Sequence, residues 1–240
     1  MSKKIAIVFG GSRGIGAACV KKLNQDGFDV ALTYVSSEPT AVEAAPGTTI
    51  KSYKADVCTP SDVAKVFADV ASDFGAAPTC VVANAGINVP PGPMAQFDPE
   101  NFRKLVEVNI VGAFNILAEA ARQVADNGTI IATTTSLVRN AVPGVGPYSA
   151  TKAAVECLVR SMSKELAGRG VRVNAVAPGP VDTDLFRSGK NEEAIKRSAG
   201  MSPLGRVGQP EEIAEVVAFL ASDKSSWVLG QIIQPNGGMI

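Results

Sequence analysis

Five consecutive apolar residues, Ile5 to Phe9, lead directly into a cluster of glycines, and this junction constrains the fold more than any other stretch. A short run that is apolar at every position is typical of a strand covered on both faces. After the glycines, Ile15, Cys19 and Leu23 recur at helical spacing up to Gly27, which is suited to end a helix. A strand, a glycine turn and a helix in this order predict the first unit of an α/β fold.

The same alternation continues along the chain. We expect further strands at 29–34, 49–55, 79–83, 129–134, 171–176 and 231–234, and helices at 60–74, 99–125, 147–167 and 210–220. Residues 36–48 hold at most a short helix, and the polar segment 184–208 has one short helical stretch near 192–197. This order predicts a doubly wound parallel sheet with helices on both faces, in a single domain over residues 1–240.

The bulk composition excludes several classes of function. Lys+Arg and Asp+Glu are both 23, which argues against nucleic acid or an anionic membrane as a partner. No apolar run approaches the ~20 residues that a membrane span needs. The chain has no histidine, which removes Ser-His-Asp catalysis and histidine-ligated metals. Tyrosine, lysine and carboxylates remain for proton transfer, and we expect no metal site.

The cysteines and the first residues indicate a reducing compartment. Cys19, Cys58, Cys80 and Cys157 are scattered, with no spacing typical of a disulfide framework or a metal site. The apolar run after the first lysines stops in the glycine cluster without a small-residue cleavage site, so we interpret it as a strand and not a signal peptide. We therefore expect a cytoplasmic location.

Tyr148 and Lys152 lie four residues apart in a predicted helix, so they share one face about one turn apart. Their free pKa values, near ~10 and ~10.4, make neither a useful acid or base alone at neutral pH. An ammonium beside the phenol lowers the tyrosine pKa and prepares it to exchange a proton with a carbonyl or alcohol oxygen. Because this spacing is common by chance, its meaning depends on the rest of the chain.

The glycine cluster has the form of a turn that holds a nucleotide pyrophosphate at a helix N-terminus. The candidate residues in it are Gly10, Ser12, Arg13, Gly14, Ile15 and Gly16. A lone glycine triplet is a weak signal, and the alternative is an ordinary glycine-rich loop. This triplet falls at the first strand-to-helix turn, where a dinucleotide-binding (Rossmann-like) fold requires it.

The end of the second strand indicates which nucleotide would bind. NAD binding usually employs an acidic residue about ~20 positions after the glycines. This chain has Tyr34, Ser36 and Ser37 there, and Arg13 can face the same ribose. A cation with hydroxyls and no acid suits a 2′-phosphate, which favours NADP(H) over NAD(H). The alternative is that Arg13 is a solvated loop charge.

Asp56 and Val57 follow the third predicted strand. Either they bind the adenine of the cofactor, or Asp56 caps a helix.

Taken with Asn84-Ala85-Gly86 after the fourth strand, Asn109, Tyr148/Lys152 and Pro178-Gly179, the sequence resembles the short-chain dehydrogenase/reductase family over nearly its whole length. It is most similar to single-domain members such as 3-oxoacyl-(acyl-carrier-protein) reductases. The resemblance implies Tyr148 as proton donor or acceptor, with Lys152 lowering its pKa and binding the nicotinamide ribose. It implies that Asn109 holds a helix kink and a water near Lys152; a satisfied core amide is the alternative. It adds Asn84, Ala85, Gly86, Pro178, Gly179, Val181 and Thr183 as residues lining the cofactor.

Two positions depart from the family pattern. Phe9 replaces the usual threonine before the first glycine, which should affect local stability more than chemistry. The substrate-orienting serine usually lies thirteen residues before the tyrosine, where this chain has Thr135; Ser136 lies twelve before. A loop one residue shorter makes Ser136 the catalytic hydroxyl, and otherwise the stiffer Thr135 fills the role.

The resemblance and the residues together predict an NADP(H)-dependent oxidoreductase acting on a small carbonyl or secondary alcohol. Residues 137–145 and a lid at 185–208 would choose the substrate. Lys190, Lys196, Arg197 and Arg206 in the lid region either attract an anionic substrate or form a solvated face. Related proteins imply a homotetramer, or failing that a dimer. The alternatives are an NAD-linked alcohol or sugar dehydrogenase working oxidatively, and a catalytically silent nucleotide-sensing scaffold.

Overall fold

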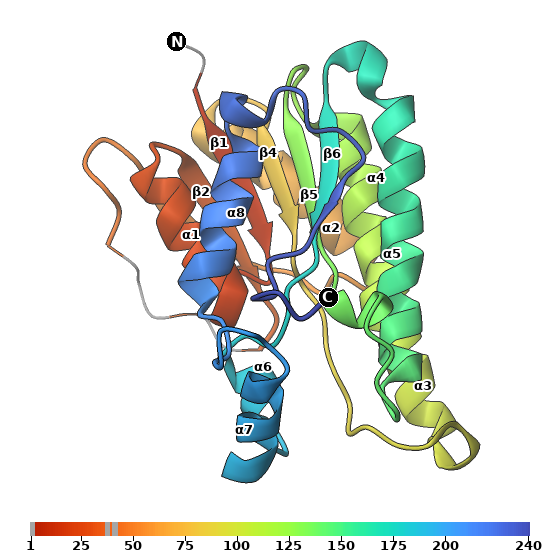
Figure 1. Ribbon diagram of the computed structural model, residues 1–240. Coiled ribbons are helices and arrows are strands. Elements are labelled where there is room, and N and C mark those ends of the chain that lie inside the picture. The colour runs from red at the N-terminus through yellow and green to blue at the C-terminus, as the bar shows by residue number, and fades with distance from the viewer. Residues whose placement is uncertain (1–2, 37–38, 40–42) are drawn as a thin grey trace.

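The computed structural model describes residues 3–36, 39 and 43–240. Seven strands form one sheet in the order β3-β2-β1-β4-β5-β6-β7, and every neighbouring pair is parallel (Figure 1). Their bounds are β1 Ile5–Phe9, β2 Asp29–Tyr34, β3 Ile50–Lys54, β4 Cys80–Ala83, β5 Thr129–Thr133, β6 Arg172–Val176 and β7 Ile232–Ile233. The predicted doubly wound, Rossmann-like sheet is confirmed. The strand order reverses between β1 and β4, where such sheets bind ligands at the carboxyl ends of the strands.

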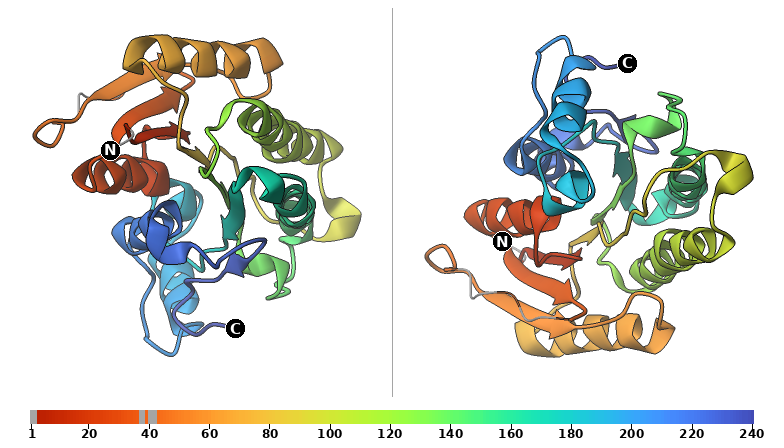
Figure 2. Two further views of the ribbon diagram at one scale, coloured as in Figure 1. Left: turned by 90° about the horizontal axis from the view of Figure 1, so that it is seen from above. Right: turned by 90° about the horizontal axis from the view of Figure 1, so that it is seen from below.

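Helices cover both faces of the sheet (Figure 2). Helices α1 (Gly14–Gln25) and α8 (Pro210–Ala221) pack on one face, and α2 (Pro60–Phe74), α4 (Ala113–Gln123) and α5 (Gly146–Glu165) pack on the other. Side chains alternate between two cores, so that Ile7 faces α2 and α4 while its neighbour Val8 faces α1. Because each fully buried aliphatic side chain contributes roughly 1.5–3 kcal/mol, these two cores hold the strand ends in fixed positions.

The predicted continuous helix at 99–125 is wrong, because the helix is interrupted. It divides into α3 (Pro99–Val106), a π-helical turn η2 (Glu107–Gly112) and α4. Asp98 begins α3 by accepting a hydrogen bond from the Glu100 N–H at 2.9 Å. Asn109 lies in the π-helical turn, and its side chain is bonded outside the helix. A π-turn of this kind is often found at functional sites.

The segment 184–208 contains two short helices where the sequence predicts one. Helix α7 (Glu192–Gly200) matches the predicted stretch, and α6 (Asp184–Arg187) is additional. Thr183 caps α6 and Asn191 caps α7 through their side-chain oxygens. Two backbone hydrogen bonds close the base of the segment: Asp182 N–H to Gly208 O and Gly208 N–H to Pro180 O, both 2.9 Å. Both helices project beyond the carboxyl ends of the strands (Figure 1).

The remaining described elements are short 3₁₀ turns. They are η1 Met94–Gln96, η3 Ser136–Val138, η4 Ala167–Arg169 and η5 Asp223–Ser225. No helix in the described part of the chain is long and apolar enough to cross a membrane. Within residues 3–36, 39 and 43–240, no group of three or more metal-ligating side chains is placed to hold a metal ion. All four cysteines are free; Cys19 and Cys80 are buried, whereas Cys157 is exposed.

Candidate active site

The turn after β1 requires glycine for steric reasons. Gly10 and Gly14 have positive φ values of 72° and 53°, which side chains rarely adopt. A Cβ on Gly16 would lie 2.1 Å from the Gly10 carbonyl oxygen, so α1 can approach the turn only with glycine there. Arg13 precedes α1 in an extended conformation and is exposed, with Ser12 and Ile15 partly exposed beside it. The turn thus presents the N-terminus of α1 and a cation at the carboxyl edge of the sheet.

Asn84, directly after β4, connects the glycine turn to β5. Its Nδ2 donates to the Gly10 carbonyl oxygen at 3.1 Å, and its Oδ1 accepts from the Thr133 hydroxyl at 3.3 Å. These bonds tie the ends of β1, β4 and β5 together. Ala85 contacts the same turn, since a Cβ on Gly10 would lie 2.9 Å from its Cα.

Gly86 lies directly against Lys152, where a side chain would be crowded. A Cβ on Gly86 would lie 3.2 Å from Lys152 Nζ and 3.1 Å from Asn109 Oδ1. Lys152 is 5% exposed, and its ammonium donates to the Thr133 carbonyl oxygen at 3.0 Å. An ammonium has three donors, so two of them remain for acceptors outside the described residues.

Tyr148 lies one turn before Lys152 on α5, and burial shifts both pKa values. Loss of water around the phenol raises the pKa of Tyr148 to about 12. Loss of water around the ammonium lowers the pKa of Lys152 to about 8. The pKa of Tyr148 is thus raised by loss of water around the phenol, and a lowering of this pKa by Lys152 stays a prediction. At neutral pH the phenol carries its proton and the amine is charged.

Asn109 holds the loop after β4 against α5. It is fully buried; its Oδ1 accepts from the Ile87 N–H at 2.9 Å, and its Nδ2 donates to Ile87 O at 3.0 Å and to Thr151 Oγ1 at 3.2 Å. Thr151 in turn donates to the Tyr148 carbonyl oxygen at 2.7 Å. The amide is thus satisfied by protein groups, and it positions both Gly86 and the helix that carries Tyr148.

Thr135 and Ser136 make different bonds. Thr135 caps η3 by accepting from the Leu137 N–H at 3.3 Å. Ser136 donates its hydroxyl hydrogen to Ala177 O at 2.7 Å and accepts from Asn236 Nδ2 at 3.4 Å. Within the described residues, neither hydroxyl bonds to Tyr148.

The turn after β6 lies against Ser136 and against the glycine turn. The Ser136 N–H donates to Pro178 O at 2.9 Å, and a Cβ on Gly179 would lie 2.9 Å from Asn236. Val181 is buried, and a Cβ on Gly14 would lie 3.2 Å from a methyl of Thr183. The structure therefore brings residues 178–183 to the glycine turn on one side and to Ser136 on the other.

The far end of the site lies at the ends of β2 and β3. Tyr34 is partly exposed and Ser36 is exposed, while Ser37 falls outside the described residues. Asp56 accepts from the Cys58 N–H at 2.9 Å and Val57 is buried; this bond lies in the turn before α2 (Pro60–Phe74), whose N-cap is Thr59, so Asp56 does not cap the helix.

Lys54 was missed by the sequence analysis. It is exposed and pairs in register with Tyr34, so a second cation lies at this edge of the sheet. Only the strand register reveals it, because twenty residues separate the two positions in the chain.

Comparison with known proteins identifies the class to which this fold and site belong. The family model described as enoyl-(acyl carrier protein) reductase matches residues 10–240. An NADPH-dependent aldehyde reductase-like protein, chloroplastic, from Arabidopsis thaliana is 38% identical over 257 residues, covering 100% of this chain and 95% of its own. A 3-oxoacyl-[acyl-carrier-protein] reductase from Staphylococcus aureus is 35% identical over 243 residues, covering 98% of both.

A solved structure agrees with these relatives. A short-chain dehydrogenase from Burkholderia cenocepacia in complex with NADP superposes with a TM-score of 0.88 at 29% identity, covering 98% of this chain and 97% of its own. The chain belongs to the short-chain dehydrogenase/reductase family and is an oxidoreductase of that family.

The residues present fit a nicotinamide dinucleotide. Glycine at positions 10 and 16 lets the turn pack directly against Ala85 and Asn84, at the N-terminus of α1, where a pyrophosphate is favoured. Lys152, beside Gly86, has two donors that make no hydrogen bond within the described residues, and these suit ribose hydroxyls. Arg13 makes no side-chain hydrogen bond or ion pair within the described part of the chain, so it is available to an anion.

Proposed function

We propose that the protein is an NADP(H)-dependent reductase of small carbonyl compounds with Tyr148 as the proton donor. The observation that carries this proposal is the pair on α5: a buried Lys152 beside Gly86, one turn from Tyr148, at the carboxyl ends of β4 and β5. The NADPH-dependent aldehyde reductase-like relative supports the same chemistry.

In the proposed reaction, the bound nicotinamide supplies a hydride to the carbonyl carbon. Tyr148 gives its phenolic proton to the carbonyl oxygen as negative charge develops there. We take Ser136, in preference to Thr135, as the hydrogen-bond donor to the same oxygen; it would exchange its present acceptor, Ala177 O, for the substrate. Lys152, held by Thr133 O, keeps a positive charge near the phenolate that remains. Fixing the carbonyl between these groups accounts for much of the expected rate.

Reduction is the direction that we propose. The phenol of Tyr148, with a pKa of about 12, carries its proton at neutral pH, which is the form that can give a proton to a carbonyl oxygen. Alcohol oxidation needs the phenolate as a base, and the free site disfavours that form. The NAD-linked oxidative dehydrogenase is therefore the second candidate.

Arg13 and Lys54 support NADP(H) as the cofactor. Both are exposed cations at the edge formed by the glycine turn and the ends of β2 and β3. A 2′-phosphate in reach of either gains charge-assisted hydrogen bonds, each worth about 1.5–3 kcal/mol. The Burkholderia cenocepacia structure was solved with NADP, which agrees with this choice.

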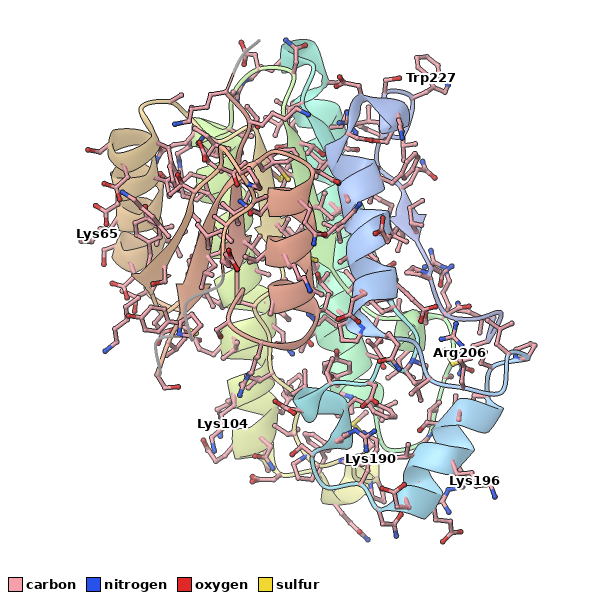
Figure 3. All side chains as sticks on the ribbon, turned by 90° about the vertical axis from the view of Figure 1, so that its left-hand side faces the viewer. Lys65, Lys104, Lys190, Lys196, Arg206 and Trp227 are labelled. Carbon is pink, nitrogen blue, oxygen red and sulfur yellow. The ribbon has the colours of Figure 1, made fainter. Side chains whose placement is uncertain are left out.

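Residues 185–208 form a lid in this proposal, and it admits a neutral, apolar substrate. Arg187 pairs with Asp182, Arg197 with Glu193 and Arg206 with Glu212, while Lys190 lies 4.4 Å from the centre of the Phe186 ring. Figure 3 shows Lys190, Lys196 and Arg206 on this projecting end of the molecule.

Few cations are thus free to bind an acidic carrier. Exposed apolar side chains occur in this segment and in η1: Leu204 (65% exposed), Leu185 (46%), Met201 (37%) and Met94 (72%).

The proposed assembly is a homotetramer in the cytoplasm. Phe114 on α4 is 53% exposed and Trp227 before β7 is 99% exposed, which leaves large apolar side chains on two separate elements. Four free cysteines agree with a reducing compartment. Gel filtration tests the assembly, and a particle of one 24.7 kDa chain would contradict it.

Direct binding tests the cofactor choice without relying on turnover. Arg13→Ala and Lys54→Ala are each expected to weaken NADPH binding by about 10- to 100-fold and to leave NADH binding unchanged, from the loss of one charged contact. The matched control is Lys104→Ala, an exposed lysine on α3 far from this edge (Figure 3). Equal losses for both nucleotides, or none, would refute the 2′-phosphate site.

A substrate panel tests the reaction. Aliphatic and aromatic aldehydes and ketones should be reduced with NADPH, faster than a β-ketoacyl thioester, and an enoyl thioester should not react. Turnover of alcohols with NAD⁺ alone would favour the oxidative dehydrogenase. Tight nucleotide binding without turnover of any substrate would favour a silent scaffold.

A further inference from the structure

The C-terminal turn, residues 234–239, contacts three parts of the site at once. Asn236 Nδ2 donates to Ser136 Oγ at 3.4 Å. The Gly179 N–H donates to Pro235 O at 3.1 Å, and the Ser202 hydroxyl donates to Gly237 O at 2.7 Å. Ser202 is buried, although most of the segment around it is exposed. The turn therefore joins the end of β5, the loop after β6 and the end of the 185–208 segment.

The orientation of the Asn236 amide is fixed by the turn itself. Its Oδ1 accepts from the Gly238 N–H at 3.0 Å and from the Met239 N–H at 3.1 Å. Rotating the amide by half a turn would place Nδ2 against two N–H donors, which no hydrogen bond could satisfy. Asn236 is 9% exposed and packs directly against Gly179, where a Cβ would lie 2.9 Å away. Nδ2 is thus the atom that must face Ser136.

This arrangement changes what the Ser136 hydroxyl can do. Asn236 donates to Oγ, so the hydroxyl hydrogen is free to point elsewhere and is given to Ala177 O at 2.7 Å. A hydroxyl that receives a hydrogen bond becomes a stronger donor, because bonds in a chain polarise one another. A substrate oxygen that replaces Ala177 O as acceptor receives the hydrogen bond from a hydroxyl already prepared in this way.

We propose that Asn236 is a positioning residue, which orients and polarises Ser136 as the hydrogen-bond donor to the substrate oxygen. The inference rests on the proposed carbonyl reduction and on Ser136 as the hydroxyl that serves it. Asn236 acts only through Ser136 and touches neither substrate nor nucleotide. The C-terminal turn is in this way part of the active site, 100 residues after the serine that it serves.

Asn236→Asp tests the proposal most sharply. A carboxylate keeps the acceptor for Gly238 and Met239 but presents an acceptor to Ser136, which turns the serine hydrogen away from the substrate. We expect kcat to fall about 10-fold at neutral pH, the effect of one lost hydrogen bond, with KM and NADPH affinity unchanged.

Lowering the pH should restore kcat, since a protonated carboxyl can again donate to Ser136. A free aspartate titrates near about 4, and burial raises that value. Asn236→Ala should show the same loss without the recovery, and it carries the test if the aspartate variant does not fold.

A matched control is Asn174→Asp. Asn174 is also a fully buried amide that ties a turn, donating to Val228 O at 2.8 Å and accepting from the Gln231 N–H at 2.9 Å, without contact to Ser136. It should lower the melting temperature and leave the pH profile of kcat unchanged.

The double variants with Ser136→Ala decide whether Asn236 acts through Ser136. Once Ser136→Ala has removed the hydroxyl, Asn236→Asp should change kcat by less than about twofold, because coupled residues are not additive. The proposal would be overturned if the losses of kcat in Asn236→Asp and Ser136→Ala multiplied in the double variant. It would also be overturned if Asn236→Asp kept the wild-type kcat, or if its pH profile of kcat matched that of the wild type. Full activity in Ser136→Ala alone would show that Ser136 is not the hydrogen-bond donor. A wild-type protein that reduces no carbonyl would refute the proposed function itself. In either case the proposal for Asn236 is wrong as well.

Discussion

Replacing Lys152 with methionine is expected to stabilise the fold while it abolishes carbonyl reduction. Lys152 is 5% exposed, and within the described residues its one hydrogen-bond acceptor is Thr133 O at 3.0 Å. Burial lowers its pKa from the ordinary 10.5 to about 8, so at neutral pH the folded protein holds a charge that its surroundings disfavour. Methionine has a similar length and no charge, so it fills the same space without that penalty.

The size of the effect follows from the pKa shift. The pKa of Lys152 falls from 10.5 to about 8 on folding. At about 1.4 kcal/mol for each pH unit, this means that the folded protein disfavours the charged lysine by roughly 3 kcal/mol. Losing the hydrogen bond to Thr133 O costs about 1 kcal/mol. Lys152→Met should therefore raise the free energy of unfolding by about 2 kcal/mol at pH 7.

The difference between the two proteins should vanish as the pH rises. Between pH 8 and 10.5 the unfolded chain keeps the lysine proton that the folded protein has released, so the wild type gains stability with rising pH. Cys19 and Cys80 act in the opposite sense above pH 9, since burial raises the pKa of each to about 12. These cysteines affect the wild type and Lys152→Met equally. The difference in the free energy of unfolding between the two proteins therefore reports on Lys152 alone.

Urea unfolding followed by far-ultraviolet circular dichroism, at a series of pH values from 7 to 10, measures this difference. Lys104→Met, at an exposed position, should stay within about 0.5 kcal/mol of the wild type at every pH. A Lys152→Met protein that is less stable than the wild type at pH 7, or a pH-independent difference, would refute the reasoning.

Three further predictions concern single residues. Tyr148→Phe should lower kcat by about 10²- to 10⁴-fold and keep NADPH affinity, measured by nucleotide absorbance and by direct binding; comparable loss of affinity would contradict it. Gly16→Ala should lower the melting temperature and abolish NADPH binding, since its Cβ would lie 2.1 Å from Gly10 O, whereas Gly168→Ala, with nothing within 4 Å, should be tolerated. Asn109→Ala should cost about 2–4 kcal/mol in urea unfolding, because it leaves the partly buried N–H and C=O of Ile87 without their partner, and Thr151→Val about 1 kcal/mol; equal costs would show that the Ile87 bonds contribute little.

Most of the fold could be predicted because its signals are local. The apolar run at 5–9 and the glycines after it determine β1, the turn and α1 within a few residues of chain. The alternation of strands and helices predicts a parallel sheet with helices on both faces, whereas the strand order is known only from the structure. Strand β7 is shorter than predicted, Ile232–Ile233 in place of 231–234, because the chain bends there into the C-terminal turn.

The interrupted helix shows where local signals fail. A polar Asn109 on an apolar stripe is visible in the sequence, but its partner Ile87 is 22 residues away. A π-turn forms where this side chain bonds outside the helix, and no periodicity predicts that contact.

The site shows the same division between local and long-range information. Tyr148 and Lys152 are four residues apart, so helical geometry alone places them together. Asn236 and Ser136 are 100 residues apart, and Lys54 meets Tyr34 only through strand register. The tyrosine pKa also depends on the tertiary structure, because the loss of water around the phenol is invisible in the sequence.

The central claim is that Tyr148 and its neighbours complete a hydride transfer from NADPH to a carbonyl carbon. The most direct measurement follows deuterium from NADPH labelled at C4 into the alcohol product by NMR, with wild type and Tyr148→Phe in parallel. The account predicts deuterium on the carbinol carbon with the wild type and almost none with the variant in the same time, although both bind NADPH. Labelled product at equal rates from both proteins, or none from the wild type with any carbonyl of the panel, would contradict it.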